Sequence, residues 1–402
     1  MSRKNSFYKV DLDIDVKQQF IKVEMELYYP ILQNKTDTIE FMLHRDLKVK
    51  ELNGDEIRSY TFNTISNQML PEAGNLKVNL KGTMKKGELI KIRLLYEGQL
   101  GVLQPYGDNR LTEDWIEMGL YFPWFPLNFQ QVSSHNIIYD IKVKIDEGYK
   151  VFGMGEVIKK NDHWTMVKYT PTNDIIIMAS RDIKVESIED EDFILNIYYD
   201  KNSEVINKYG LWILSKYKEW FGTTKEKNMS VVFAKGGAYA RKGFVVLEKY
   251  KLESNDYNEI DYFTNMLGHE FAHLWWSNAP ADTWESWIDE AFAEYSALRV
   301  LREKFGEEEF KKAIKIRENR SNNTPPIKNL DMSYEKRKVV IYDKGSLLLY
   351  KLEEELGEEN FLKLLKEINN KRVSNTEEFL DILTKLFEED ITKKFERLLR
   401  DF

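Results

Sequence analysis

The sequence has no cysteine among its 402 residues, and this absence limits the chemistry available to it. Disulfide bonds, cysteine nucleophiles and zinc sites built on thiolates are all excluded. Any metal site must therefore use histidine, aspartate or glutamate, and histidine is itself scarce, with five in the whole sequence.

Long apolar runs and an excess of positive charge are also absent. No apolar run approaches the ~18 residues that cross a bilayer, and the first residues lack the apolar stretch of a signal peptide. The 59 basic and 67 acidic side chains give a formal net charge of -8, which argues against a nucleic-acid partner. We therefore expect a cytoplasmic protein without a membrane span, while a soluble part excised from a longer protein stays an alternative.

The hydrophobic pattern changes near residue 185. Before it, apolar and polar residues alternate in segments such as 8–14, 23–29, 90–96 and 139–145, which is typical of strands with one buried face. After it, we expect strands at 193–199, 229–234 and 244–247, a helix at 203–221, and helices almost throughout from 258 onward. The prediction is an α+β chain, with an all-β, sandwich-like domain at 1–185 and a mainly helical domain at 186–402.

The chemistry is concentrated in an H-E-x-x-H motif that begins at His269. On a helix, His269 and His273 lie on the same face, so both imidazoles can reach one metal ion. Apolar residues recur at helical spacing around the motif, and capping groups precede it at Ser254, Asn255 and Asp256. Glu270 is placed to take a proton from metal-bound water. The other histidines, His44, His135 and His163, lack ligand spacing and are interpreted as structural.

A catalytic zinc usually has three protein ligands and one open position. The best third ligand is Glu290, in a second expected helix that runs to Gly306. An acidic residue on a helix is more often a solvated charge, but an apolar, aromatic segment after the motif favours a ligand here. Glu294 lies one helical turn beyond Glu290 and could accept a hydrogen bond from a ligand histidine. An ordinary polar contact with no role at the metal is an equal alternative for Glu294.

These segments resemble the M1 family of zinc aminopeptidases, gluzincins that include leukotriene A4 hydrolase. The likeness covers the motif through Trp276, the segment 287–295, and 339–345, where the family's catalytic tyrosine maps onto Tyr342. The β-rich first half is similar to the family's N-terminal domain. The resemblance implies a saddle-like β domain followed by a thermolysin-like zinc peptidase domain with one zinc ion per chain and a peptide substrate.

Three departures from the family pattern affect what the resemblance implies. The spacer before Glu290 is two residues shorter, as a loop deletion would produce. The larger members continue into a C-terminal helical domain, so a partner or a missing domain is a candidate cover for the cleft. The third departure is in the loop that resembles the family's G-x-M-E-N segment, whose glutamate binds the substrate's free amine. That position is Ala240 here, and Arg241 follows it.

Several residues near this loop are candidate substrate contacts under the resemblance. The loop itself would approach an extended peptide through Gly236, Gly237, Ala238 and Tyr239, with Arg241 beside them, although a simple turn is an equal alternative for the two glycines. A positive charge at Arg241 would repel a substrate ammonium group. Glu113 and Asp114 are candidates to replace the missing amine-binding carboxylate.

Three functions remain open from the sequence. The leading one is zinc-dependent hydrolysis of peptide bonds, with uncertain exopeptidase specificity. The second is a zinc hydrolase of a non-peptide substrate such as an epoxide. The third is a non-catalytic peptide-binding scaffold. The retained general base argues against it, because a site without catalysis does not need one.

Overall fold

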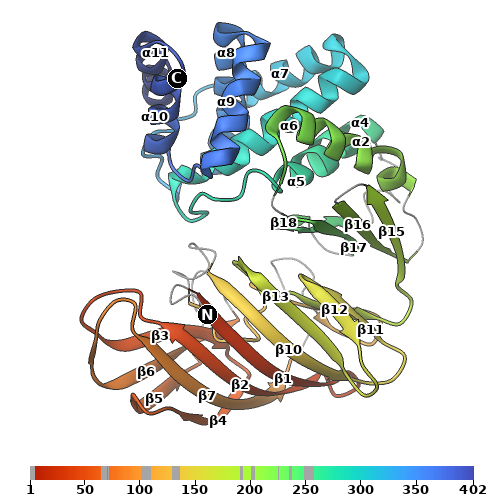
Figure 1. The fold of residues 1–402 in the computed structure, drawn as a ribbon, viewed down its shortest axis with the longest axis vertical. Coiled ribbons are helices and arrows are strands. Elements are labelled where there is room, and N and C mark those ends of the chain that lie inside the picture. The colour runs from red at the N-terminus through yellow and green to blue at the C-terminus, as the bar shows by residue number, and fades with distance from the viewer. Residues whose placement is uncertain are drawn as a thin grey trace. The chain divides into compact units, whose positions relative to one another are not determined.

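The computed structural model describes all residues except 1–4, 65–69, 71, 101–109, 129–135, 191–192, 201–203, 225, 235–237 and 249–257. The described residues form two compact units. The first covers residues up to Val185, and the second covers Glu186–Ala234 and Ala238–Phe402. Each unit has a hydrophobic core of its own. The colours of Figure 1 follow the chain from the first unit into the second.

The first unit is built from three β-sheets (Figure 1). The largest has the strand order β12 (Glu156–Lys159), β13 (Trp164–Thr172), β10 (Ile137–Ile145), β1 (Ser6–Asp15), β2 (Phe20–Pro30), β7 (Leu89–Gln99), β4 (Lys48–Asn53). A three-stranded sheet has the order β3 (Thr36–His44), β6 (Ala73–Met84), β5 (Ile57–Asn63). A four-stranded sheet has the order β11 (Lys150–Gly153), β14 (Ile177–Ser180), β9 (Ile116–Met118), β8 (Arg110–Leu111).

The period-two pattern of the sequence explains how these strands face. Along β1, Val10 and Leu12 are buried while Lys9 and Asp11 are exposed, because successive side chains point to opposite faces of a sheet. The long-range pairing is not visible in that pattern. Strand β1 pairs in parallel with β10, more than a hundred residues further along the chain.

The second unit begins with a five-stranded sheet. Its order is β15 (Lys184–Asp190), β16 (Phe193–Tyr199), β17 (Asn228–Ala234), β19 (Phe244–Glu248), β18 (Tyr239–Arg241). Strands β16, β17 and β19 are parallel, and β18 is an antiparallel strand at the edge. Helix α2 (Glu204–Phe221) connects β16 to β17, as a parallel pair requires.

Helices make up the rest of the second unit (Figure 1). They are α4 (Glu259–Tyr262), the π-helical segment η1 (Phe263–Gly268), α5 (His269–Ala272), the short 3₁₀ turn η2 (Trp284–Ser286), α6 (Trp287–Phe305), α7 (Glu307–Ser321), a second π-helical segment η3 (Val339–Lys344), α8 (Gly345–Leu356), α9 (Glu358–Lys371), α10 (Thr376–Leu386) and α11 (Glu389–Asp401). Among the helices that the structure describes, none is long and apolar enough to cross a membrane.

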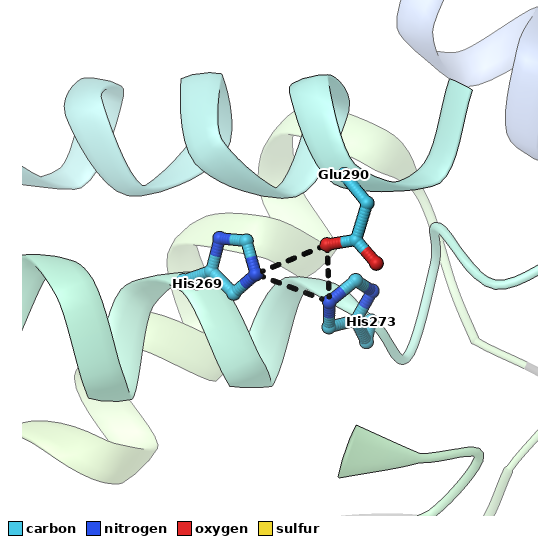
Figure 2. Close-up of side chains that lie close together, drawn as sticks. All are labelled: His269, His273 and Glu290. Atoms are coloured by element: carbon cyan, nitrogen blue, oxygen red, sulfur yellow. Dashed lines mark hydrogen bonds and ion pairs between the residues drawn. The ribbon is translucent and has the colours of Figure 1, made fainter. Parts of the chain in front are cut away.

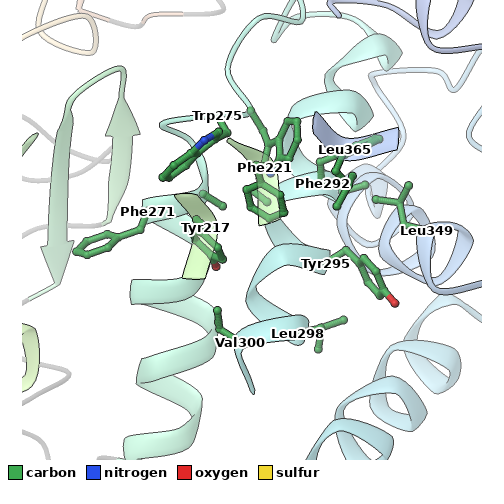
Figure 3. Packing of buried hydrophobic residues seen from close by; sticks show 14 of the residues in the cluster. Tyr217, Phe221, Phe271, Trp275, Phe292, Tyr295, Leu298, Val300, Leu349 and Leu365 are labelled. Atoms are coloured by element: carbon green, nitrogen blue, oxygen red, sulfur yellow. The ribbon is translucent and has the colours of Figure 1, made fainter. Parts of the chain in front are cut away.

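Helix α6 is the centre of this unit. It is buried on all sides rather than along one stripe, which is typical of a helix packed inside a large core. Figure 3 shows its side chains Phe292, Tyr295 and Leu298 in the same cluster as residues from α2, α8 and α9. This burial holds Glu290, in the first turn of α6, in a fixed place.

The fold prediction is confirmed at the level of class: an all-β part precedes a helical part, and the chain is α+β. Strand β15 was not expected, and it begins just before the boundary at 185/186. The capping groups expected at 254–256 lie outside the described residues, and Asn258 caps α4 by accepting from the amides of Ile260 and Asp261.

Candidate metal centre and its surroundings

The two motif histidines converge through the same ring nitrogen. His269 begins α5 and His273 follows its last residue, and their Nε2 atoms lie 3.3 Å apart. The other nitrogen of each ring is already engaged. Nδ1 of His269 lies 3.0 Å from Oε2 of Glu294, and Nδ1 of His273 lies 2.8 Å from the carbonyl oxygen of Trp276. Both rings are therefore held with Nε2 facing the same point.

Glu290 completes a triangle with these nitrogens (Figure 2). Its Oε2 lies 3.4 Å from Nε2 of His269 and 3.6 Å from Nε2 of His273. This oxygen is buried, and among the described residues no donor gives it a hydrogen bond. Tetrahedral zinc with ligand bonds of about 2.0–2.2 Å separates its ligand atoms by about 3.3–3.6 Å. The residues present therefore fit a zinc ion in donor type, orientation and spacing.

The electrostatics of the triangle favour positive charge. Burial lowers the pKa of His269, but Glu290 and Glu294 outweigh this effect and raise it well above its usual value. Burial raises the pKa of Glu290, but His273 and His269 outweigh this and hold it far below the ordinary value. A site that binds positive charge this strongly suits a divalent cation.

Glu270 and Tyr342 lie beside the triangle. Glu270 is buried, and burial raises the pKa of its carboxyl, while His269 and His273 lower it. The ring of Tyr342, on η3, stacks against that of His269 with centroids 5.6 Å apart and 12° between planes. Burial, followed by the charge of Glu290, raises the pKa of Tyr342 well above its usual value, so its hydroxyl stays protonated and able to donate.

The loop residues expected to contact substrate are placed only in part. Gly236 and Gly237 lie outside the described residues. Ala238 precedes β18, and this edge strand carries Tyr239, Ala240 and Arg241. The guanidinium of Arg241 lies 5.1 Å from the Tyr239 ring, and its charge reaches Glu270, whose pKa it lowers.

Glu113 and Asp114 are exposed residues of the first unit, between β8 and β9. Oδ1 of Asp114 accepts a 2.7 Å hydrogen bond from Thr112, and the carbonyl oxygen of Glu113 accepts one from Tyr149. They are not among the residues that the second unit brings together around the triangle.

The spacer between His273 and Glu290 is short, but the helices on both sides of it form. The side chain of Asp289 holds the spacer in place through hydrogen bonds. The carboxylate of Asp289 accepts hydrogen bonds from the amides of Asn278 at 3.0 Å and Ala279 at 2.9 Å. This turn follows directly on Trp276, whose carbonyl orients His273. Sequence reasoning missed this contact, although an aspartate directly before Glu290 was a visible signal.

A second group that could hold a metal, His44, Asp46 and Glu72, lies in the first unit. Its members are engaged with their own neighbours. Nδ1 of His44 accepts from the Asp46 amide at 3.3 Å, and Glu72 pairs with Arg45 at 3.1 Å. Burial lowers the pKa of His44 to about 4. These contacts agree with a structural role for His44; His163 pairs with Asp162, and His135 lies outside the described residues.

Comparison with known proteins assigns part of the chain to a family. Residues 233–398 match the model of the peptidase family M1 domain. These residues, 233–398, carry a peptidase family M1 domain. The resemblance of the motif segments to this family is thereby confirmed, and the family implies zinc as the metal.

The relatives differ widely from this chain in sequence. The alanine/arginine aminopeptidase of Saccharomyces cerevisiae is 24% identical over 54% of this chain and 28% of its own length. The mitochondrial aminopeptidase 2 of the same yeast is 22% identical over 87% of this chain and 40% of its own length. The chain thus spans less than half of either relative.

A solved structure matches the fold over nearly its whole length. It is a mutant M1 zinc metallopeptidase from Deinococcus radiodurans bound to a Tyr-Ser-Ala substrate. The TM-score is 0.75 at 14% identity, and the match covers 99% of this chain and 94% of that one. At this identity the likeness establishes the fold.

A close contact between small residues joins the start of α8 to the first turn of α6, next to Glu290. A Cβ added to Gly345, which follows η3, would lie 2.5 Å from Cβ of Ala291 on α6. We expect Gly345→Ala to destabilise the protein by about 1–3 kcal/mol, because two rigid helices must separate. Because η3 would move with α8, turnover of a peptide substrate should fall as well.

The matched controls for Gly345→Ala are a rescue and a neutral site. Adding Ala291→Gly should restore much of the stability and turnover, since it removes the opposing methyl group. Gly82→Ala, where no atom lies within 4 Å of the new Cβ, should change neither. Thermal unfolding and a peptide-cleavage assay measure both effects, and an unchanged Gly345→Ala variant would contradict the argument.

Proposed function

We propose that this chain is a zinc peptidase that hydrolyses peptide bonds, with one zinc ion held by His269, His273 and Glu290. The observation that carries the proposal is the triangle of ligand atoms, with edges of 3.3, 3.4 and 3.6 Å. It is supported by the family match and by two residues beside the triangle, the buried Glu270 and the partly buried Tyr342. On this proposal, residues 186–402 are the catalytic domain and 1–185 are an N-terminal β domain.

The chain's own residues have distinct roles in this proposal. A zinc ion bound at the triangle would acidify a water molecule and polarise the scissile carbonyl. Glu270 receives the proton that this water loses and delivers it to the nitrogen of the leaving amine. The hydroxyl of Tyr342 donates a hydrogen bond to the oxygen that becomes negatively charged in the transition state. Glu294 holds the ring of His269 in place through Nδ1.

The proposed substrate is an extended peptide. Strand β18 ends the five-stranded sheet, and an edge strand offers backbone groups to which a peptide can pair. The substrate bound in the solved structure from Deinococcus radiodurans is a tripeptide. Ala240 lacks the carboxylate that would bind a free amine, and Arg241 adds positive charge near Glu270. A cytoplasmic location and a partner or further domain that covers the metal centre belong to the proposal as well.

The test is cleavage of one fluorogenic peptide series in two forms, with free and with acetylated N-termini, together with metal analysis of the purified protein. We expect one bound zinc per chain and cleavage that a chelator abolishes and added zinc restores. Cleavage of the acetylated form would assign blocked-peptide or endopeptidase specificity to the Ala240–Arg241 change. Cleavage of the free form alone would make it an aminopeptidase, with Glu113 and Asp114 the next residues to test. Absence of zinc, or no cleavage of either form, would overturn the proposal.

A further inference from the structure

A buried arginine contacts Glu294, the carboxylate that holds His269 of the triangle. Arg317, on α7, is 5% exposed, and its guanidinium faces Glu294 rather than solvent. Its Nε donates to Oε1 of Glu294 at 3.1 Å, and a terminal nitrogen donates to the same oxygen. The other terminal nitrogen donates to the carbonyl oxygen of Ala313 at 3.1 Å. Each oxygen of Glu294 therefore has a separate partner, Arg317 at Oε1 and His269 at Oε2.

The division of the two oxygens has a physical consequence. A buried carboxylate such as Glu294, 8% exposed, is costly to keep ionised unless a cation compensates its charge. Arg317 supplies that cation, because a guanidinium stays charged in proteins. Two donors on one oxygen also fix the plane of the carboxylate. Oε2 is thereby aimed at Nδ1 of His269, which leaves Nε2 of that ring for the triangle.

Arg317 also faces the element that carries Tyr342. Its Nε lies 3.9 Å from Oδ1 of Asp343, the residue after Tyr342 on η3. Asp343 is buried, at 7% exposed. One guanidinium thus lies between a carboxylate on α6 and a carboxylate on η3. These are the two elements that place Glu290 and Tyr342.

We propose that Arg317 is a positioning residue of the metal centre, which holds the His269 ring through Glu294 and the Tyr342 segment through Asp343. It touches neither metal nor substrate. The inference rests on the proposed function, since it assigns to Arg317 the alignment of groups that function requires. The loss of such a supporting contact commonly lowers metal affinity or activity by about 10–100-fold.

The first test measures zinc affinity by competition with a chromophoric chelator, in the wild type and in Arg317→Gln. We expect about 10–100-fold weaker zinc binding for Arg317→Gln and partial retention in Arg317→Lys, which keeps the charge but loses the fork of donors. The matched control is Arg320→Gln, which removes the same charge from an exposed position of the same helix. Its zinc affinity should equal that of the wild type.

The second test asks whether Arg317 acts through Glu294. In a Glu294→Gln background, adding Arg317→Gln should weaken zinc binding far less than it does alone, because the shared contact is already broken. In zinc-saturated protein, Arg317→Gln should lower kcat with little change in KM, and the visible spectrum of the cobalt-substituted variant should differ from that of the wild type.

The outcomes separate this inference from the proposed function. If the wild type binds zinc and cleaves peptides while Arg317→Gln binds zinc as tightly as the wild type, the positioning role is wrong and the function stands. Additive losses in the double variant would likewise overturn it. If Arg317→Gln does not fold, wild-type zinc affinity and kcat in Arg317→Lys and in Glu294→Gln would overturn it equally. If the wild-type protein bound no zinc, the proposed function itself would be wrong.

Discussion

Glu270→Gln is expected to lower peptide turnover by about 10²–10⁴-fold, the usual range for the loss of a general base. The amide that replaces the carboxylate has the same shape but cannot accept the proton of an attacking water. Glu270 is buried beside His269 and does not belong to the ligand triangle. Zinc content should therefore stay at the wild-type level. The measurements are kcat and KM on the preferred peptide and zinc content by elemental analysis.

The control for Glu270→Gln is a change that removes a ligand instead. Glu290→Gln replaces the charged corner of the triangle and should lower both zinc affinity and turnover, so that excess zinc restores part of the activity. Excess zinc should restore nothing in Glu270→Gln. A Glu270→Gln variant with wild-type turnover would exclude the proposed proton transfer. Retained peptide binding with no cleavage by either the variant or the wild type would instead favour a binding scaffold.

Local patterns of the sequence predict the elements around the site well, because each pattern reflects which face of an element is buried. The expected strands and helix at 193–247 correspond to β16, α2, β17 and β19 with small shifts at their ends. The spacing of His269 and His273, and the turn between Glu290 and Glu294, likewise indicate the groups that the structure brings together.

The parts that sequence did not predict depend on contacts between distant residues or on backbone groups. His273 is oriented by a carbonyl oxygen, which any residue at 276 would provide. Arg317 reaches Glu294 from the next helix, and no spacing rule connects them. The two π-helical segments also escaped prediction, because one extra residue in a turn hardly changes an apolar pattern.

At the start of α10 the structure keeps one half of a local motif that the sequence predicts. Asn375 and Glu378, three residues apart, have the spacing of a capping box. Asn375 does accept a hydrogen bond from the Glu378 amide at 3.0 Å. The Glu378 carboxylate, however, accepts from the amide and hydroxyl of Ser374 instead of the amide of Asn375. The preceding serine offers two donors to the carboxylate, so the carboxylate contact of the motif is shifted by one residue while Asn375 remains the N-cap.

The largest effect on stability is expected at Glu353, a buried carboxylate of α8. Three side chains bind it: Tyr295 at 2.5 Å, Arg302 at 2.7 Å, and Arg299, which is itself almost fully buried. We expect Glu353→Gln to lower the free energy of unfolding by about 3–5 kcal/mol, because the buried Arg299 loses its buried counter-charge and keeps the exposed Glu358. Urea unfolding followed by tryptophan fluorescence measures the change.

The matched control is Glu354→Gln, an exposed neighbour on the same helix, for which we expect a change within about 0.5 kcal/mol. If Glu353→Gln changed the free energy of unfolding by as little as this, the contacts of Glu353 with Tyr295, Arg299 and Arg302 would contribute little to stability.

The effect of Glu353 should depend on pH in a defined direction. Burial raises the pKa of this carboxyl, but Arg299 and the hydrogen bonds around it outweigh burial and lower it below the ordinary value of 4.5. A group with a lowered pKa in the folded state stabilises the fold fully above its unfolded pKa. That contribution is lost as the pH falls through the folded-state value. The stability difference between wild type and Glu353→Gln should therefore be constant near neutral pH and shrink on acidification below about pH 4.5. If the stability difference grew on acidification instead, the assignment of a lowered pKa to Glu353 in the folded state would be wrong.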